Sequence, residues 1–260
     1  MIQQHCYTKA KKGYDTVACS PGLSEAFVKE RLHPFCDYHP SRILQAKRVP
    51  AAEFPRALTV IQFPEKKMLL GQTIYVEPGP TGGESTFFTH NYVLPRPDKL
   101  LPEDIGHMLY RTVFLTESDW EQLPELEELP LHKGETPSVG PLPFDKKRLL
   151  QLIYVLLEAV TGTRKVYVVL PDLEWVNPML MWLYSQLPHP AQQALGFTTY
   201  SRKTENKKFL HLIFMDKGSL DPDEDSLDYF LDFDSGYFSK NMLEVSEKFL
   251  QERIKSFTLK

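Results

Sequence analysis

The sequence has few cysteines, and its first residues do not predict a secretory leader. It holds three cysteines, Cys6, Cys19 and Cys36, among 260 residues. An odd and small number of thiols argues against a disulfide framework, and free thiols are typical of the reducing cytosol, so we expect a cytoplasmic protein. The first residues are polar and contain no apolar core of the signal-peptide type, which agrees with that expectation.

Long apolar runs and an excess of basic charge are also lacking. The most apolar stretch, Leu149 to Val160, is interrupted by Gln151 and Glu158 and is shorter than the roughly 20 residues that span a bilayer. Lys and Arg number 30 against 34 Asp and Glu, which gives a formal charge of −4. A nucleic-acid binder that works by bulk charge needs a basic surface. We therefore expect neither a membrane nor a nucleic-acid partner.

Glycine is scarce relative to proline, with 13 glycines against 21 prolines. Because proline lacks a backbone donor and fixes φ, such a chain is expected to have many loops and short, interrupted elements. Apolar residues make up 42% and charged residues 25%, which is ordinary for a folded protein and argues against a disordered chain.

The first half of the chain has the composition of strands. A short helix with Ser24 as its N-cap is expected at Ser24–Arg31. The apolar run Ile105–Phe114 fits a helix or a strand, because short apolar runs are ambiguous by periodicity. Strands, of which the last three form an antiparallel meander, are predicted at residues 2–8, 14–19, Ala57–Phe63, Met68–Val76 and Ser85–Leu94.

Helix and strand patterns alternate in the second half. The clearest helix spans Asp145–Thr161, with Asp145 as its N-cap and Gly162 at its end. A helix over Pro178–Leu187 is expected to begin at an Asn177 cap. The remaining expected elements are a strand at Lys165–Leu170, a short helix at Pro190–Leu195, strands at Phe197–Tyr200 and Phe209–Met215, and a last helix at Ser239–Phe257.

These patterns predict an α+β fold, with a β-rich N-terminal half that contains an antiparallel meander and a mixed α/β half that ends in a C-terminal helix. The segment between the halves is rich in proline and glutamate. We expect a β-rich subdomain over residues 1–120, a proline-rich acidic linker or long loop over 121–144, and an α/β subdomain over 145–260. A second acidic run, 216–234, is expected to be a solvated loop that could face a partner.

Cys19 is one candidate for chemistry, because it lies between a predicted strand and a predicted helix. A helix N-terminus lowers the pKa of a nearby thiol, and His33 or His90 could act as the base of a small hydrolase or transferase. The segment lacks the flanking glycines of a nucleophile elbow. The alternative interpretation is that Cys19 is a small packed residue with no catalytic role.

The tightest cluster of metal-type side chains is His33, Cys36 and His39. Imidazole and thiolate groups are zinc ligands, but this spacing matches no common zinc motif. Pro34 and Pro40 explain the segment equally well as a rigid turn. We predict no metal and no cofactor.

A polar pair inside a predicted strand is the candidate for a ligand site. Alternation places His90 and Tyr92 on one face of the strand and Asn91 on the other. Such groups could line a ligand cleft or satisfy buried backbone groups. The loop with Gly82 and Gly83 could hold an anion through its backbone N–H groups, although it lacks the lysine and following helix of a P-loop. The candidate ligand or interaction residues are His90, Asn91, Tyr92, Ser20, Gly82 and Gly83.

Five segments together carry a family resemblance. The segments are QQHCYT at residues 3–8, Gly13–Leu23, His33–Tyr38, Phe87–Pro95 and Leu187–Tyr200. They resemble bacterial GTPase-associated adaptor proteins whose N-terminal domain is of type 2, found in NTP-dependent conflict systems. The first four fall in the N-terminal region of that class, and the fifth resembles its middle region.

The resemblance implies a non-enzymatic adaptor that links a GTPase or other NTPase to effectors, and it supplies no active site. Members of the class are usually longer, so it also implies that this chain is part of a longer protein or a form without the C-terminal module. Two alternatives remain open from the residues themselves. One is the Cys19 hydrolase or transferase, and the other is a ligand-sensing domain built on His90, Asn91 and the glycine loop.

Overall fold

The chain folds into two compact units, each built from three separate stretches of sequence. Unit 1 comprises Met1–Arg96, Thr112–His132 and Thr198–Lys208, and unit 2 comprises Pro97–Arg111, Lys133–Phe197 and Phe209–Lys260. The computed structural model describes residues 1–47, 49–76, 86–116, 122–132, 134–138, 140–202, 207–217, 228–239 and 247–258.

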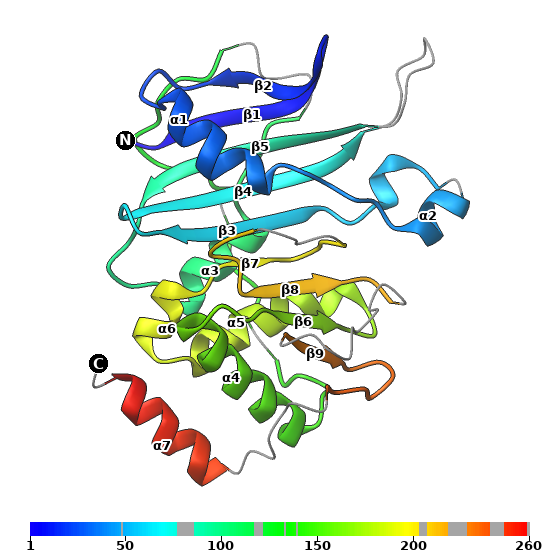
Figure 1. Cartoon of the computed structure of the whole chain (residues 1–260), viewed down its shortest axis with the longest axis vertical. Coiled ribbons are helices and arrows are strands. Elements are labelled where there is room, and N and C mark those ends of the chain that lie inside the picture. Colours follow the sequence, from blue (N-terminus) through cyan, green and yellow to red (C-terminus); the bar gives the residue numbers. More distant parts are fainter. Residues whose placement is uncertain are drawn as a thin grey trace. The chain divides into compact units, whose positions relative to one another are not determined.

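Unit 1 is organised around five antiparallel strands in the order β2-β1-β5-β4-β3 (Figure 1). The sequence patterns predicted the meander β3-β4-β5, and the pairing confirms it. The hairpin β1-β2 joins this meander because β1 pairs with β5. The strands are β1 (Gln3–Ala10), β2 (Gly13–Cys19), β3 (Ala57–Phe63), β4 (Lys67–Val76) and β5 (Thr86–Pro95).

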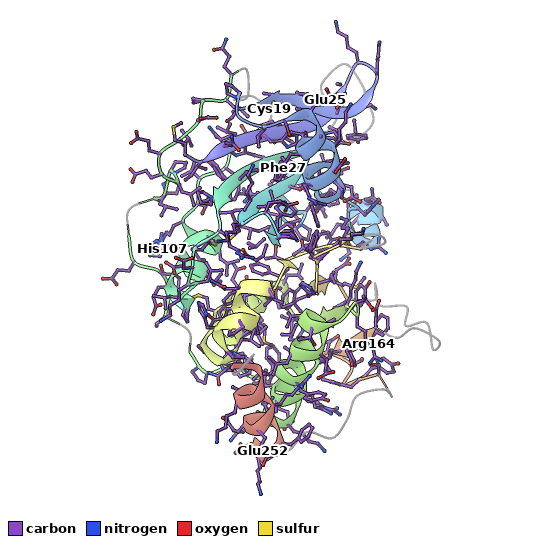
Figure 2. All side chains as sticks on the ribbon, turned by 60° about the vertical axis from the view of Figure 1, so that its left-hand side comes forward. Cys19, Glu25, Phe27, His107, Arg164 and Glu252 are labelled. Atoms are coloured by element: carbon purple, nitrogen blue, oxygen red, sulfur yellow. The ribbon has the colours of Figure 1, made fainter. Side chains whose placement is uncertain are left out.

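A short helical segment covers one face of this sheet, which we call the helical face. It begins at α1 (Glu25–Phe27), where the Ser24 hydroxyl accepts a hydrogen bond from the Phe27 N–H, as the predicted N-cap requires. The segment continues as a π-helical turn over Val28–Leu32 and a 3-10 turn over His33–Phe35, so the predicted short helix is present but changes from α to π hydrogen bonding after Phe27. The Phe27 ring, labelled in Figure 2, meets Phe63 of β3 edge-on.

The opposite face of the sheet, which we call the loop face, lies under the Thr112–His132 segment. Leu123 packs there against Cys6 of β1 and Phe88 of β5. The same segment bridges the start of the chain, because Ile2 and Leu126 exchange two backbone hydrogen bonds. Both faces of the sheet are therefore covered, which explains why polar strand residues such as His90 and Asn91 are fully buried.

Thr198–Lys208 completes unit 1 along β3. The backbone N–H of Thr199 donates to the Leu58 carbonyl at 2.8 Å, and the hydroxyl of Thr59 donates to that of Thr198 at 3.0 Å. Lys207 forms an ion pair with Asp37. Two further short elements of unit 1 are α2 (Arg42–Lys47) and a 3-10 turn at Ala51–Glu53, and β7 (Phe197–Thr198) lies where the chain passes between the units.

Unit 2 places helices beside a parallel set of strands. Strand β6 pairs in parallel with both β8 and β9, and the predicted Asp145 cap of α4 is confirmed because its carboxylate accepts from the Arg148 N–H. The elements are α3 (Pro102–Tyr110), α4 (Lys146–Thr161), β6 (Val166–Val169), a 3-10 turn (Leu173–Trp175), α5 (Val176–Gln186), α6 (His189–Ala194), β8 (Leu212–Met215), β9 (Tyr229–Asp232) and α7 (Glu247–Thr258).

The structure confirms the α+β class and corrects some element boundaries. The ambiguous run Ile105–Phe114 is helical up to Tyr110, as part of α3, and its remaining residues lie outside the helix. The predicted Asn177 cap is wrong, because α5 starts at Val176, two residues before the predicted start, after a 3-10 turn that the Asp172 carboxylate caps. The last predicted helix, Ser239–Phe257, is present from Glu247 onward as α7. Residues 240–246 of that prediction lie outside the described residues. In the part of the chain that the structure describes, no helix is long and apolar enough to span a membrane.

Candidate functional site

A chain of hydrogen bonds crosses the helical face of unit 1. The side-chain amide of Asn91 on β5 donates to Nδ1 of His5 at 3.1 Å and to Sγ of Cys36 at 3.3 Å. The other ring nitrogen of His5 lies 2.9 Å from the Thr16 hydroxyl, which is 2.8 Å from Nε2 of His33. Three strands and the segment that carries His33 and Cys36 thus share one polar network.

The donors in this network can be assigned from chemistry. Because an amide nitrogen only donates, His5 Nδ1 accepts from Asn91 and the His5 proton resides on Nε2. His5 Nε2 therefore donates to Thr16, and the Thr16 hydroxyl donates onward to His33. Both nitrogens of the His5 ring are occupied, so the ring holds strands together and has no free nitrogen to accept a proton.

Burial keeps the network uncharged. Desolvation, assisted by the nearby rings of His33 and His90, lowers the pKa of His5 to about 3. Desolvation likewise raises the pKa of the Cys36 thiol to about 12, so the thiol stays protonated and donates to the Leu32 carbonyl. Desolvation also lowers the pKa of His33. At neutral pH these groups act as neutral hydrogen-bonding groups.

On the loop face, His90 binds the Thr112–His132 segment to the sheet through a hydrogen bond. The backbone N–H of Leu115 donates to His90 Nδ1 at 3.0 Å, so the proton lies on Nε2, which is 3.1 Å from the acceptor oxygen of Gln4. The Tyr92 hydroxyl donates to the Val113 carbonyl at 2.6 Å. Burial lowers the pKa of His90 to about 3. His90 and Tyr92 thus share the face that strand alternation predicts.

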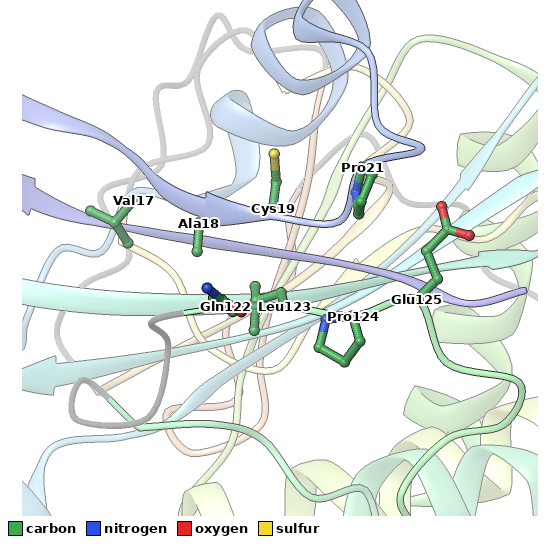
Figure 3. Close-up of a pocket in the computed structure, with 8 residues that line it drawn as sticks. All are labelled: Val17, Ala18, Cys19, Pro21, Gln122, Leu123, Pro124 and Glu125. Carbon is green, nitrogen blue, oxygen red and sulfur yellow. The ribbon is translucent and has the colours of Figure 1, made fainter.

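Ser20 and Cys19 end β2 in different environments. The Ser20 hydroxyl accepts from the Gln4 N–H at 2.8 Å and donates to the Pro124 carbonyl at 3.1 Å. Cys19 is exposed beside a cavity of about 800 Å³ that Leu123 and Glu125 help to line. Figure 3 shows Ala18 pointing toward the Gln122–Glu125 segment and the Cys19 thiol pointing away from it.

The register decides which imidazoles share a face with Cys19. Cys19 pairs with His5 across β1-β2, whereas His90 pairs with Cys6 across β1-β5. Directly paired residues project from the same face of a sheet, so Cys19 and His90 project from opposite faces. His33 lies on the side of Cys19, where its Nε2 is bonded to Thr16. The imidazole opposite Cys19 is that of His5, which is fully buried.

The structure separates the remaining candidates. His90 and Asn91 are both buried, but they lie on opposite faces of the sheet. The described residues include no group of three or more His, Cys, Asp or Glu side chains placed to hold a metal ion. Within the predicted metal set, the ring of His39 lies 3.4 Å from the Asp37 carboxylate, while His33 and Cys36 belong to the network. Gly82 and Gly83 lie outside the described residues.

Sequence reasoning identified His90 and Asn91 but missed their partners. Gln4, His5 and Thr16 bond to them directly or through one neighbour, from strands more than 70 residues away in the chain. The one local signal was the unusually polar composition of the first strand, QQHCYT, which is atypical of a strand covered on both faces.

Thiol labelling should separate the three cysteines. Cys19 is exposed, whereas Cys6 and Cys36 are buried and burial raises the pKa of both thiols. Because the thiolate is the reactive form, we expect Ellman's reagent to titrate one thiol quickly in the native chain and three in denaturant. Cys19→Ser should abolish the fast reaction. Fast reaction of a second thiol in the native chain would contradict the described burial.

Two models of known protein families match the chain. The family model described as GTPase-associated protein 1, N-terminal domain type 2, matches residues 1–130, which contain the whole polar network. The chain belongs to the GTPase-associated protein 1 family. The model for the middle domain of GTPase-associated protein 1 matches residues 137–235. No curated protein matches the chain.

The two matches confirm the resemblance drawn from the five sequence segments. The first four segments lie inside the type 2 N-terminal domain, and the fifth, Leu187–Tyr200, lies inside the middle domain. The chain is therefore a GTPase-associated module. The network at His5 and Asn91 is part of the interior of its N-terminal domain.

Proposed function

We propose that this GTPase-associated protein 1 chain is a non-enzymatic, cytoplasmic adaptor that links a GTPase or related NTPase to effector proteins in a bacterial conflict system. The observation that carries the proposal is the family membership, which covers both domains of the chain. The proposal needs a protein partner and requires no metal or cofactor.

The hydrogen bonding of unit 1 supports an adaptor over an enzyme. An acid–base catalyst needs a group whose pKa lies near the working pH and which can reach the substrate. His5 and His90 meet neither condition, since both rings are buried and the pKa of each is about 3. The candidate base His33 is engaged by Thr16. The polar groups inside the sheet thus stabilise the fold, and recognition of a protein partner would use the surface of the unit.

Co-purification tests this proposal. The tagged full chain, expressed in its native cell, should retain an NTPase together with at least one further protein, and the tag alone should retain neither. The Cys19→Ser variant is the matched control, because an adaptor should retain the same partners without this thiol. Recovery of no NTPase by a folded, tagged chain would overturn the adaptor proposal.

A turnover measurement on the captured complex separates the enzymatic alternative. If a reaction product accumulates with the native chain and fails to accumulate with Cys19→Ser, while the partners are still retained, the chain is a cysteine-dependent enzyme and the proposal is wrong. A complex whose activity is unchanged by Cys19→Ser supports the adaptor.

A further inference from the structure

A stack of aromatic rings lies on the helical face of unit 1, beyond the polar network. The rings of Tyr14 on β2 and Phe87 on β5 are 4.4 Å apart and only 6° from parallel. Tyr7 of β1, between those strands, lies 6.3 Å from each of them, with its plane 14° and 17° from theirs. Tyr7 also meets the ring of His33 edge-on at 4.8 Å. Three strands therefore present one layer of rings.

These rings are fixed in place yet partly open to solvent. Tyr14 is 42% exposed, although its ring is held by Phe87 and its hydroxyl accepts from the Thr86 hydroxyl at 3.1 Å. Tyr7 and Phe87 are half-buried. Aromatic side chains held rigidly at a surface offer a large contact area with little further loss of rotamer freedom on binding. Interface hot spots are enriched in such tyrosines.

Three lysines lie beside the stack, in and next to the turn of the β1-β2 hairpin. Lys9 pairs directly with Tyr14 across the β1-β2 hairpin and so projects from the same face. Lys11 and Lys12 are exposed in the turn of that hairpin. Asp15 is the acidic residue of the hairpin, against these three lysines, in a chain whose net charge is −4. The hairpin is therefore a basic patch on a chain of opposite net charge.

A structural role alone accounts for only part of this arrangement. Lysines at the edge of a sheet discourage pairing with other chains, and β2 is the outer strand of unit 1. That role explains the lysines but not the exposed ring of Tyr14, which adds apolar surface where protection calls for polar groups. Rigid rings bordered by lysines fit a binding surface for an extended acidic segment, whose carboxylates meet the lysines while its apolar groups cover the rings.

We propose that this surface docks an acidic segment of the partner protein. This proposal rests on the adaptor function proposed above and names the contact through which the adaptor binds. The surface, called the hairpin face from here on, consists of Tyr7, Lys9, Lys11, Lys12, Tyr14 and Phe87.

The test compares how well the full-length chain and its variants capture the GTPase or other NTPase that co-purifies with the native chain. Tyr14→Ala should weaken binding by about tenfold or more, as removal of a central aromatic anchor does. Tyr14→Phe keeps the ring and should bind within about twofold of the native chain. The double variant Lys11→Glu/Lys12→Glu should slow association by about tenfold at low salt, and this difference should shrink as salt is added.

A matched charge reversal controls for net charge. Lys99 and Lys208 are exposed and lie outside the hairpin, so Lys99→Glu/Lys208→Glu changes the net charge equally and should bind like the native chain. Circular dichroism and thermal melting check that each variant is folded. A synthetic peptide of alternating glutamate and tyrosine should compete with the GTPase at the hairpin face, and a single-stranded oligothymidylate should not.

The outcomes separate this inference from the adaptor proposal. If the native chain captures no GTPase and no other NTPase, the adaptor proposal fails. If the native chain captures the NTPase, and Tyr14→Ala and Lys11→Glu/Lys12→Glu both capture it as well as the native chain does, the adaptor proposal stands. The hairpin face is then not the docking surface. If the oligothymidylate displaces the GTPase more strongly than the acidic peptide, the face binds nucleic acid and the inference is wrong.

Discussion

Gly71→Ala is expected to destabilise unit 1 by about 3 kcal/mol, because overpacking and the loss of buried hydrogen bonds add together. Gly71 of β4 pairs with Asn91 of β5, and a Cβ atom at Gly71 would overlap the side-chain oxygen of Asn91. The Asn91 side chain cannot move aside without losing hydrogen bonds, because its amide donates to both His5 and Cys36. Urea unfolding followed by circular dichroism would measure the loss.

A double-mutant cycle tests the cause. In an Asn91→Ala background the overlap is gone, so the added cost of Gly71→Ala should fall by about 1–3 kcal/mol, the range found for residues in contact. Gly140→Ala is the control, because a Cβ atom at Gly140 meets nothing within 4 Å. It should change stability by less than about 0.5 kcal/mol. An equal cost of Gly71→Ala in both backgrounds would show that Asn91 is not the obstacle.

Lowering the pH from 6.5 to 4.5 is expected to remove about 5 kcal/mol of stability through two histidines alone, at 1.36 kcal/mol for each proton and pH unit. His5 and His90 ordinarily titrate near 6.5, but burial lowers the pKa of each to about 3 in the folded chain. Between these pH values the unfolded chain binds two protons that the folded chain excludes. The contribution of these two histidines to stability is thus complete above pH 6.5, and it is lost as the pH falls toward 3.

Urea titrations at several pH values check this slope. His90→Gln lowers absolute stability, but it should reduce the pH slope by about 1.4 kcal/mol per pH unit, since one excluded proton disappears. A slope that His90→Gln does not alter would mean that His90 accepts a proton in the folded chain.

Local patterns were enough to predict most elements of the fold. The strand predicted at Ala57–Phe63 coincides with β3, and the Asp145 cap starts α4 as expected, because both depend on neighbours in sequence. Asn177 fails as a cap because a 3-10 turn, nucleated by Asp172, has already begun the helix. Capping residues compete, and the sequence does not show which one is used.

The candidate site was predictable only in part. Strand alternation placed His90 and Asn91 on opposite faces correctly, since that periodicity is local. Their partners depend on the pairing of β1 with β5, which joins residues about 86 positions apart. The hairpin face also depends on that pairing, because Phe87 reaches Tyr14 across β1. A hydropathy pattern contains no information on which distant strand becomes the neighbour.

The interleaved make-up of unit 1 restricts how this chain could be rearranged in evolution or in the laboratory. A contiguous fragment ending at residue 130 would lack Thr199, which donates to β3, and Lys207, which pairs with Asp37. Such a cut would expose the hydrogen-bonding groups of a strand that is buried along its length, a condition that promotes aggregation. We therefore expect the region matched by the N-terminal domain to be unstable on its own, and fusion or domain-exchange experiments should carry both matched regions together.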